Sequence, residues 1–244
     1  MTGAGRGEST PERPQDWFGL LLLAIGLVLA SLFLADAVRD FAVRDRYVEV
    51  KGLAEREVRA DLAIWPITYS LSAETLETLR ERMDRTDESV IAYLKLNGFG
   101  DDEIRRNPPQ VTDRWLNSFD NQRPTDRYSA QRTLTLRTTR VDATRQAMDQ
   151  AADLISQGVP LMPNWGNDAQ FLFTGLEAIK PEMIAEATAD ARRAAAQFAE
   201  DSGSAVGAIR SARQGYFTID ERDRTAPEIK RIRVVTTIEY FLDE

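Results

Sequence analysis

The chain has 244 residues, of which 43% are hydrophobic and 29% are charged, a composition typical of a folded globular protein. Its 39 acidic and 31 basic side chains give a formal net charge of −8, which argues against broad electrostatic binding of nucleic acid. It contains neither cysteine nor histidine, which excludes disulfides, thiolate metal sites, and both Cys–His and Ser–His–Asp catalysis. The absence of cysteine also fits an oxidising compartment.

The N-terminal region divides into a polar stretch and an apolar one. Residues 1–16 are rich in Gly, Pro and charge, and we predict a disordered tail there. Residues 17–35 contain no charged side chain. A helix of that length rises about 28 Å, close to the thickness of the bilayer hydrocarbon core. We therefore predict a single-pass transmembrane signal-anchor helix at 17–35 that binds the lipid bilayer.

Cleavage and orientation of this segment have competing readings. Ala35-Asp36-Ala37 has the small-x-small form of a signal-peptidase site, but the apolar run exceeds the usual length of about 7–15 residues, which favours an uncleaved anchor. Basic residues lie on both sides of the run: Arg6 and Arg13 before it, and Arg39, Arg44, Arg46 and Lys51 after it. This excess after the run points the following domain into the cytoplasm, although large domains also translocate despite their charge. Residues 36–46 are predicted to be a charged stalk.

A folded domain is predicted over residues 47–244, beginning with extended segments at 47–50 and 58–70. In the second segment one face is apolar, formed by Val58, Ala60, Leu62 and Ile64. Pro66 cannot donate a ladder hydrogen bond, so we predict that its strand lies at a sheet edge or is bulged there.

The next predicted element is a helix that Ser72 caps and Asn97-Gly98 ends. Its apolar stripe consists of Leu76, Leu79, Met83, Val90 and Leu94. Residues 104–115 are predicted to be extended and interrupted by Pro108-Pro109, and the alternation of residues 128–139 predicts a clear strand.

The second half of the domain adds two helices and three strands. A helix is predicted at 142–156, with Ala147, Met148, Ala151, Leu154 and Ile155 facing inward, and a short strand at 169–173. A third helix is predicted to open at Pro181, where the missing N–H is harmless, and to end near Glu200. Its inner stripe is Ile184, Ala187, Ala191, Ala194, Ala195 and Phe198.

Residues 206–219 and 230–242 are predicted to close the chain as a hairpin. The last strand has one apolar face, formed by Ile232, Val234, Thr236, Ile238, Tyr240 and Leu242. The predicted order is therefore β-α-β-β-α-β-α-β-β, which indicates the α+β class rather than a doubly wound parallel sheet.

No pattern in the sequence specifies a catalytic, cofactor-binding or metal-binding residue. Asp101-Asp102-Glu103 lacks the spacing of a calcium loop, and we interpret it as a solvated turn rather than a metal site. Carboxylate catalysis stays open, because a catalytic pair is defined by its separation in space. Trp115, Phe119 and Trp165 either cover the edge of the core beneath long loops or form a ligand or subunit contact.

Two blocks resemble the SIMPL-domain family of bacterial envelope proteins. Residues 48–63 resemble its opening strands, with Gly52, Glu55 and Asp61 at signature positions. Residues 171–173, 182–192 and 195–207 are similar to its Ala-rich helix and following strand. The resemblance spans residues 48–242 and departs from the family at Trp65-Pro66 and in the charged loop 220–227.

This resemblance implies a SIMPL-type α+β domain in the bacterial periplasm or on the cell surface, with no established enzymatic activity. Relatives include stress-protective envelope proteins, a periplasmic immunogenic protein that assembles into a ring, and an animal signalling adaptor. We expect a non-enzymatic protein of the bacterial cell membrane with its C-terminal domain outside the cytoplasm. Its expected role is binding, scaffolding or stress protection, with self-assembly into a homo-oligomer. A signalling adaptor and a carboxylate-dependent envelope hydrolase are the alternatives.

Overall fold

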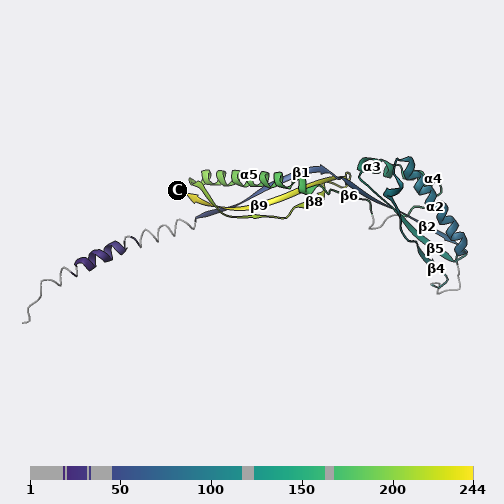
Figure 1. Ribbon diagram of the computed structural model, residues 1–244, viewed down its shortest axis with the longest axis horizontal. Helices are drawn as coiled ribbons and strands as arrows, with labels where there is room; N and C mark the ends of the chain where they lie inside the picture. Colours follow the sequence, from purple (N-terminus) through teal and green to yellow (C-terminus); the bar gives the residue numbers. More distant parts are fainter. Residues whose placement is uncertain are drawn as a thin grey trace, which may run out of the picture. The chain divides into compact units, whose positions relative to one another are not determined.

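The computed structural model describes residues 19, 21–31, 33, 46–116, 124–162 and 168–243 (Figure 1). Its helices and two sheets confirm the predicted α+β class. The predicted tail at 1–16 and nearly all of the predicted stalk at 36–46 lie outside the described residues.

The predicted transmembrane segment at 17–35 is described only in part, and its residues 21–31 are helical. Among the described residues, no helix combines the length and apolar character needed to cross a membrane.

The described strands are β1 (Tyr47–Arg59), β2 (Leu62–Ala73), β3 (Ile104–Arg106), β4 (Gln110–Asp113), β5 (Tyr128–Thr138), β6 (Gln170–Leu172), β7 (Ala205–Gln214), β8 (Thr218–Glu221) and β9 (Ile229–Asp243). The helices of the domain are α2 (Leu76–Leu96), α3 (Val141–Asp149), α4 (Ala152–Ser156) and α5 (Leu176–Ser202), with a 3-10 turn η1 at Asp101–Glu103. Joining β1 to β2, β3 to β4, α3 to α4 and β7 to β8 reproduces the predicted order.

The predicted strand at 58–70 is wrong, because a turn at Ala60 and Asp61 divides it. β1 joins one sheet, of order β1-β9-β7, in which β8 also pairs with β9. β2 joins the other, of order β3-β5-β2-β6, in which β4 also pairs with β5. Val58 and Leu62 therefore belong to different sheets and share no face.

The prediction for Pro66 is also wrong. β2 pairs with β5 in one unbroken antiparallel register over residues 63–73, in which Pro66 lies opposite Thr135, so β2 is an interior strand without a bulge at this pair. On its other side, β2 pairs with β6 only through residues 62–64. Pro66 follows the end of that short ladder, where its missing N–H costs no hydrogen bond to β6.

The chain divides into two compact units, each described here by itself. The small unit comprises residues 1–52, 191–213 and 237–244, and the large unit comprises residues 53–190 and 214–236. β1, α5 and β9 contribute residues to both units.

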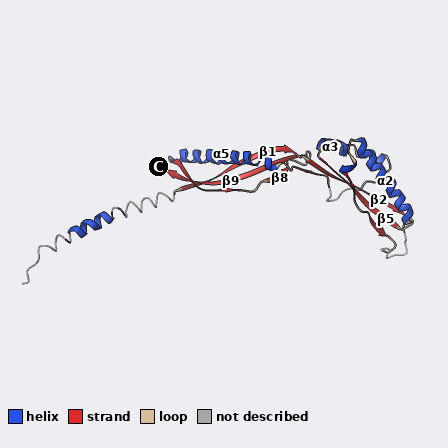
Figure 2. Cartoon of the chain, in the orientation of Figure 1, coloured by secondary structure: helices blue, strands red, loops and turns tan. Residues whose placement is uncertain are grey.

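In the large unit, α2 packs along β2 and β5 (Figure 2). The buried side chains of this core include Trp65, Ile67, Leu79, Met83, Val90, Leu94, Ala130, Leu134 and Leu136. Thr75 rather than Ser72 caps α2, because β2 continues through Ala73, and the Thr75 Oγ1 accepts a hydrogen bond from the Thr78 N–H at 3.2 Å. The prediction that Leu76 belongs to the inner stripe is wrong, because Leu76 is 54% exposed.

The helix predicted at 142–156 is interrupted between α3 and α4. Ala147 and Leu154 are buried as predicted, whereas Ile155 is exposed. A second apolar cluster of the large unit joins β1, α5 and β9 through Ala54, Met183, Ala187, Ile232 and Val234.

In the small unit, Val48, Val50, Ala191, Ala195, Ile238 and Tyr240 form the core. The buried residues of α5 recur every fourth position from Met183 to Ala199. The predicted inward positions of Ala187, Ala191 and Ala195 are confirmed, and those of Ala194 and Phe198 are wrong because both are exposed. The start predicted at Pro181 is wrong too, because α5 begins at Leu176. The apolar face of β9 is confirmed, since its side chains from Ile232 to Tyr240 alternate between buried and partly exposed.

Candidate functional site

A buried ionic cluster lies where α2 crosses β2 and β5 in the large unit. Tyr69 of β2 and Arg132 of β5 are direct cross-strand partners, and Asp87 of α2 contacts both. Tyr69 is fully buried, and Asp87 is 4% exposed. The helix and the two strands thus bring together three polar side chains inside an otherwise apolar core.

The Asp87 carboxylate accepts hydrogen bonds on both oxygens. The Tyr69 hydroxyl donates to Oδ1 at 2.6 Å, and the Arg132 Nη1 donates to Oδ2. Arg106 of β3 adds a longer ion pair, with its Nε 3.9 Å from Oδ2. A buried carboxylate requires this kind of compensation, because an uncompensated charge there would be strongly destabilising.

Burial raises the pKa of Tyr69 well above its ordinary value, and the hydrogen bond to Asp87 raises it further. Tyr69 is therefore a protonated hydrogen-bond donor at neutral pH. The cluster has the chemistry of a structural ion network, in which each group fixes the rotamer of the next.

The predicted solvated turn at Asp101-Asp102-Glu103 is correct for its first two residues and wrong for Glu103. Asp101 and Asp102 are exposed, and Asp101 pairs with Lys95 at 2.8 Å. The Glu103 carboxylate instead accepts hydrogen bonds from the Gly100 N–H at 2.8 Å, from the Thr138 hydroxyl and from Arg140. Burial alone would raise the pKa of Glu103, but these three hydrogen bonds together lower it.

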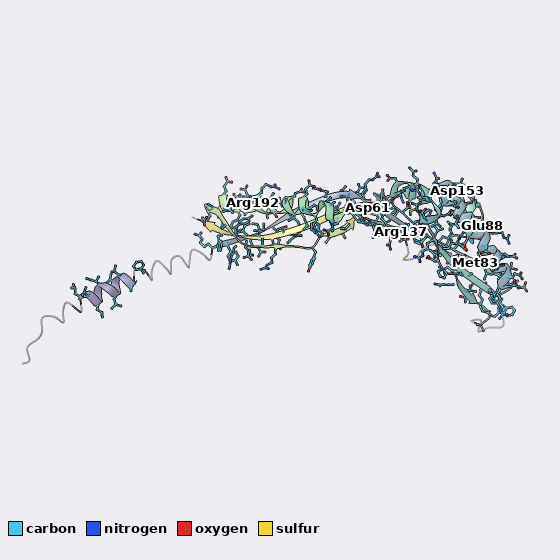
Figure 3. All side chains as sticks on the ribbon, viewed as in Figure 1. Asp61, Met83, Glu88, Arg137, Asp153 and Arg192 are labelled. Atoms are coloured by element: carbon cyan, nitrogen blue, oxygen red, sulfur yellow. The ribbon has the colours of Figure 1, made fainter. Side chains whose placement is uncertain are left out.

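Asp61, a signature position of the resemblance and labelled in Figure 3, accepts hydrogen bonds from the loop that opens α5. Its carboxylate accepts from the Thr174 N–H at 2.8 Å, the Thr174 hydroxyl at 3.0 Å and the Gly175 N–H at 3.0 Å. These amides precede the first turn of α5, where N–H groups lack helical partners and a negative charge is favourable. Asp61 therefore acts as a turn residue that orders the segment before α5.

The other two signature residues lie in β1. Gly52 is buried, and Glu55 pairs with Arg231 at 3.2 Å. The next N–H along the strand, that of Leu53, donates to the Asp190 carboxylate of α5 at 2.9 Å. The roles of these residues are therefore in strand and helix packing.

Of the three predicted aromatic contacts, only Trp115 lies among the described residues. Its indole N–H donates to the Pro124 carbonyl at 3.1 Å, and the Arg127 guanidinium lies 4.9 Å from its ring centroid. Arg127 also binds Asp113 at 2.7 Å. Phe119 and Trp165 lie outside the described residues, so the predicted contact among these aromatic residues stays a prediction.

The sequence reasoning missed the Asp87 cluster, although a signal was present. Asp87 comes four residues after Met83 and three before Val90, so it occupies the apolar stripe of its helix. Arg132 likewise interrupts the apolar face of its strand between Ala130 and Leu134. Two opposite charges on inward faces of neighbouring elements indicate a buried pair.

Within the described parts of the chain, no group of three or more acidic side chains is arranged to hold a metal ion. No curated protein matches the sequence. The model of the SIMPL family, described as a protein of unknown function (DUF541), matches residues 48–236, which is well over half of the chain. The match covers both blocks that carry the resemblance and nearly every described element of the two units. The chain therefore belongs to the SIMPL family.

Proposed function

We propose that this protein is a membrane-anchored envelope protein whose SIMPL domain lies outside the cytoplasm and acts through self-association and binding rather than catalysis. Its proposed role is scaffolding or stress protection. Four arguments support the proposal, concerning the anchor, the location, the chemistry and the exposed sheet edge.

The anchor is supported by the charge-free run at 17–35. We expect this segment to stay attached to the mature protein, because it is longer than the apolar region of a cleaved signal peptide. Mass spectrometry of the protein extracted from membranes tests this expectation. A mature N-terminus at Val38 would contradict the anchor.

The extracytoplasmic location is supported by membership in the SIMPL family and by the absence of cysteine. The basic residues after the apolar run argue for the opposite orientation. We give them less weight, because that rule is weak for large domains.

The non-catalytic role is supported by Asp87, the buried acidic residue of the large-unit core, whose carboxylate oxygens are both occupied by hydrogen bonds. Asp87 already accepts hydrogen bonds from Tyr69 and Arg132, so its oxygens are committed to the fold. A catalytic carboxylate instead needs access to substrate and a pKa matched to its task.

Self-association is supported by β7, the observation that carries this part of the proposal. β7 is ten residues long and ends the sheet order β1-β9-β7, so among the described residues no strand pairs with its outer side. It is largely exposed, and its Ile209 is 48% exposed. Long open edges tend to pair with other strands, and tethering in a membrane raises the effective concentration of identical subunits.

Light scattering on the full chain in a nonionic detergent tests the assembly. We expect an oligomer mass that Ile209→Lys shifts toward the monomer, because a charge on an edge strand opposes pairing. Ile155→Lys is the matched control, since Ile155 is 61% exposed and belongs to the helix α4 rather than to a strand edge. A monomer mass for the unmodified chain would contradict the proposed self-association.

The alternatives have their own tests. A signalling adaptor would co-purify with an unrelated membrane protein in a fixed ratio. A carboxylate-dependent hydrolase would turn over a cell-wall glycan and lose that activity when one acidic residue is replaced.

A further inference from the structure

An open groove of about 360 Å³ lies in the large unit between α2 and the segment that follows α4. We propose that this groove binds a small organic anion, whose charged group lies between Arg82 and Arg85 and whose apolar part contacts Leu71 and Val159. The inference goes beyond the proposed function, because it depends on neither the anchor nor the assembly.

The charge of the groove is the first argument. Among the described residues, two arginines and no acidic side chain line it, although the chain as a whole carries a net charge of −8. Within the described part of the chain, Arg82 and Arg85 bond only to backbone carbonyls, whereas their neighbour Arg80 pairs with Asp84 at 3.9 Å. The groove is therefore a local positive site on an acidic protein, which favours an anion.

Each of the two exposed guanidinium groups also makes one hydrogen bond to the backbone. The Arg82 Nη1 donates to the Ser72 carbonyl at 2.7 Å, and the Arg85 Nε donates to the Glu81 carbonyl at 3.3 Å. Each guanidinium carries five N–H donors, so most remain for a ligand. A planar fork of donors matches the oxygens of a carboxylate or a phosphate.

The hydroxyl groups of the groove do not compete for this role. The Thr86 Oγ1 donates to the Arg82 carbonyl at 2.9 Å, and the Ser89 Oγ donates to the Arg85 carbonyl at 3.0 Å. Their protons are thus used within α2. The side-chain donors left in the groove are the two arginines and the Gln157 amide, a set that suits an oxyanion better than a cation.

The size and apolar lining of the groove indicate an organic ligand rather than a bare ion. Leu71 and Val159 are the large apolar side chains that line it, and the half-buried Leu71 offers most of the apolar contact because Val159 is 2% exposed. A volume of about 360 Å³ lies at the lower end of the range of roughly 300–1,000 Å³ typical of small-molecule sites.

Phenyl phosphate is the probe, because it joins an oxyanion to a small apolar group. Its binding to the full chain in nonionic detergent is measured by calorimetry, with inorganic phosphate as competitor. We expect Arg82→Gln and Arg85→Gln each to weaken binding about tenfold, the effect of losing one charge-assisted hydrogen bond. Arg80→Gln is the matched control, since it removes the same charge from an α2 residue outside the groove, and it should change binding less than about twofold.

Competition by inorganic phosphate, together with selective loss in the Arg82 and Arg85 variants, supports the site. No binding of phenyl phosphate, binding that phosphate does not displace, or equal loss in all three variants overturns it. Arg82→Gln also removes the bond to the Ser72 carbonyl, so its urea midpoint is compared with that of the unmodified chain. Arg85→Gln removes only an intrahelical bond, and unchanged binding in this variant overturns the proposal even when Arg82→Gln is unstable.

Discussion

Neutralising Asp87 should destabilise the large unit far more than removing the exposed arginine that also pairs with it. The substitution Asp87→Asn keeps the size of the side chain but removes its charge. Arg132 then loses its ionic partner while its side chain stays only 17% exposed, and its Nε is already buried without a hydrogen-bond partner among the described residues. Leaving such a charge unpaired costs roughly 3–5 kcal/mol. Because Arg132 keeps some exposure to solvent, we expect the free energy of unfolding to fall by about 3 kcal/mol.

Arg106→Gln supplies the matched comparison, because Arg106 faces the same carboxylate from 3.9 Å with 59% of its side chain exposed. Exposed pairs contribute about 0–1 kcal/mol, so we expect a loss of about 0.5 kcal/mol. Replacing both members of the buried pair, in Asp87→Leu with Arg132→Met, should be less destabilising than Asp87→Asn alone, since no uncompensated charge remains.

The assay is urea unfolding of the full chain in nonionic detergent, followed by fluorescence. Trp65 is 7% exposed in the same core, so replacing Trp17, Trp115 and Trp165 by Phe leaves one probe of the large unit. A probe within the large unit reports on the unit that contains the Asp87 cluster. Similar losses for Asp87→Asn and Arg106→Gln would refute this account of the cluster.

Three further predictions concern single contacts of the large unit. Asp61→Ala should cost about 1–2 kcal/mol in unfolding free energy, because the amides before α5 lose their acceptor, and a loss below about 0.3 kcal/mol would contradict the capping role. The pKa of Glu103 is lowered in the fold, so its ionised carboxylate stabilises the fold at pH values above the ordinary glutamate pKa of about 4.3. This stabilisation is lost as the pH falls below that pKa. Glu103→Gln should therefore flatten the fall in stability between about pH 5 and pH 3. Tyr93→Phe should lower the free energy of unfolding by about 1–2 kcal/mol, because the Tyr93 hydroxyl donates to the Ala147 carbonyl at 2.5 Å in the core. An unchanged urea midpoint would refute this prediction.

Much of the fold could be predicted because single elements carry strong periodic signals. The alternation of β5 and β9 and the stripe of α2 from Leu79 to Leu94 depend only on local spacing, and the structure confirms them. The ends of helices and strands are harder to predict from the sequence, because they depend on contacts with residues distant in sequence. Pro181 resembles a helix start, yet α5 begins five residues earlier at Leu176, next to amides that the distant Asp61 binds.

The side-chain clusters could be predicted less well, for the same reason. Asp87, Tyr69 and Arg132 are far apart in sequence, and only the register of β2 and β5 places Tyr69 opposite Arg132. Glu103 looked like part of an exposed acidic run, because nothing nearby in sequence indicates that Thr138 and Arg140 donate to it. The sequence pattern shows that Asp87 and Arg132 occupy inward faces, but it does not show which residues they contact.

The orientation of the domain tests the central proposal most directly, since a location outside the cytoplasm limits every partner the protein can have. Two reporters are fused separately after Glu244, one that folds only after export because it needs disulfides and one that is active only in the cytoplasm. Both fusions are expressed in a Gram-negative bacterium and measured in intact cells, with membrane association checked by fractionation. We predict activity of the export-dependent reporter alone, in the membrane fraction. Activity of the cytoplasmic reporter alone would contradict the proposal and support the orientation that the basic residues after the apolar run favour.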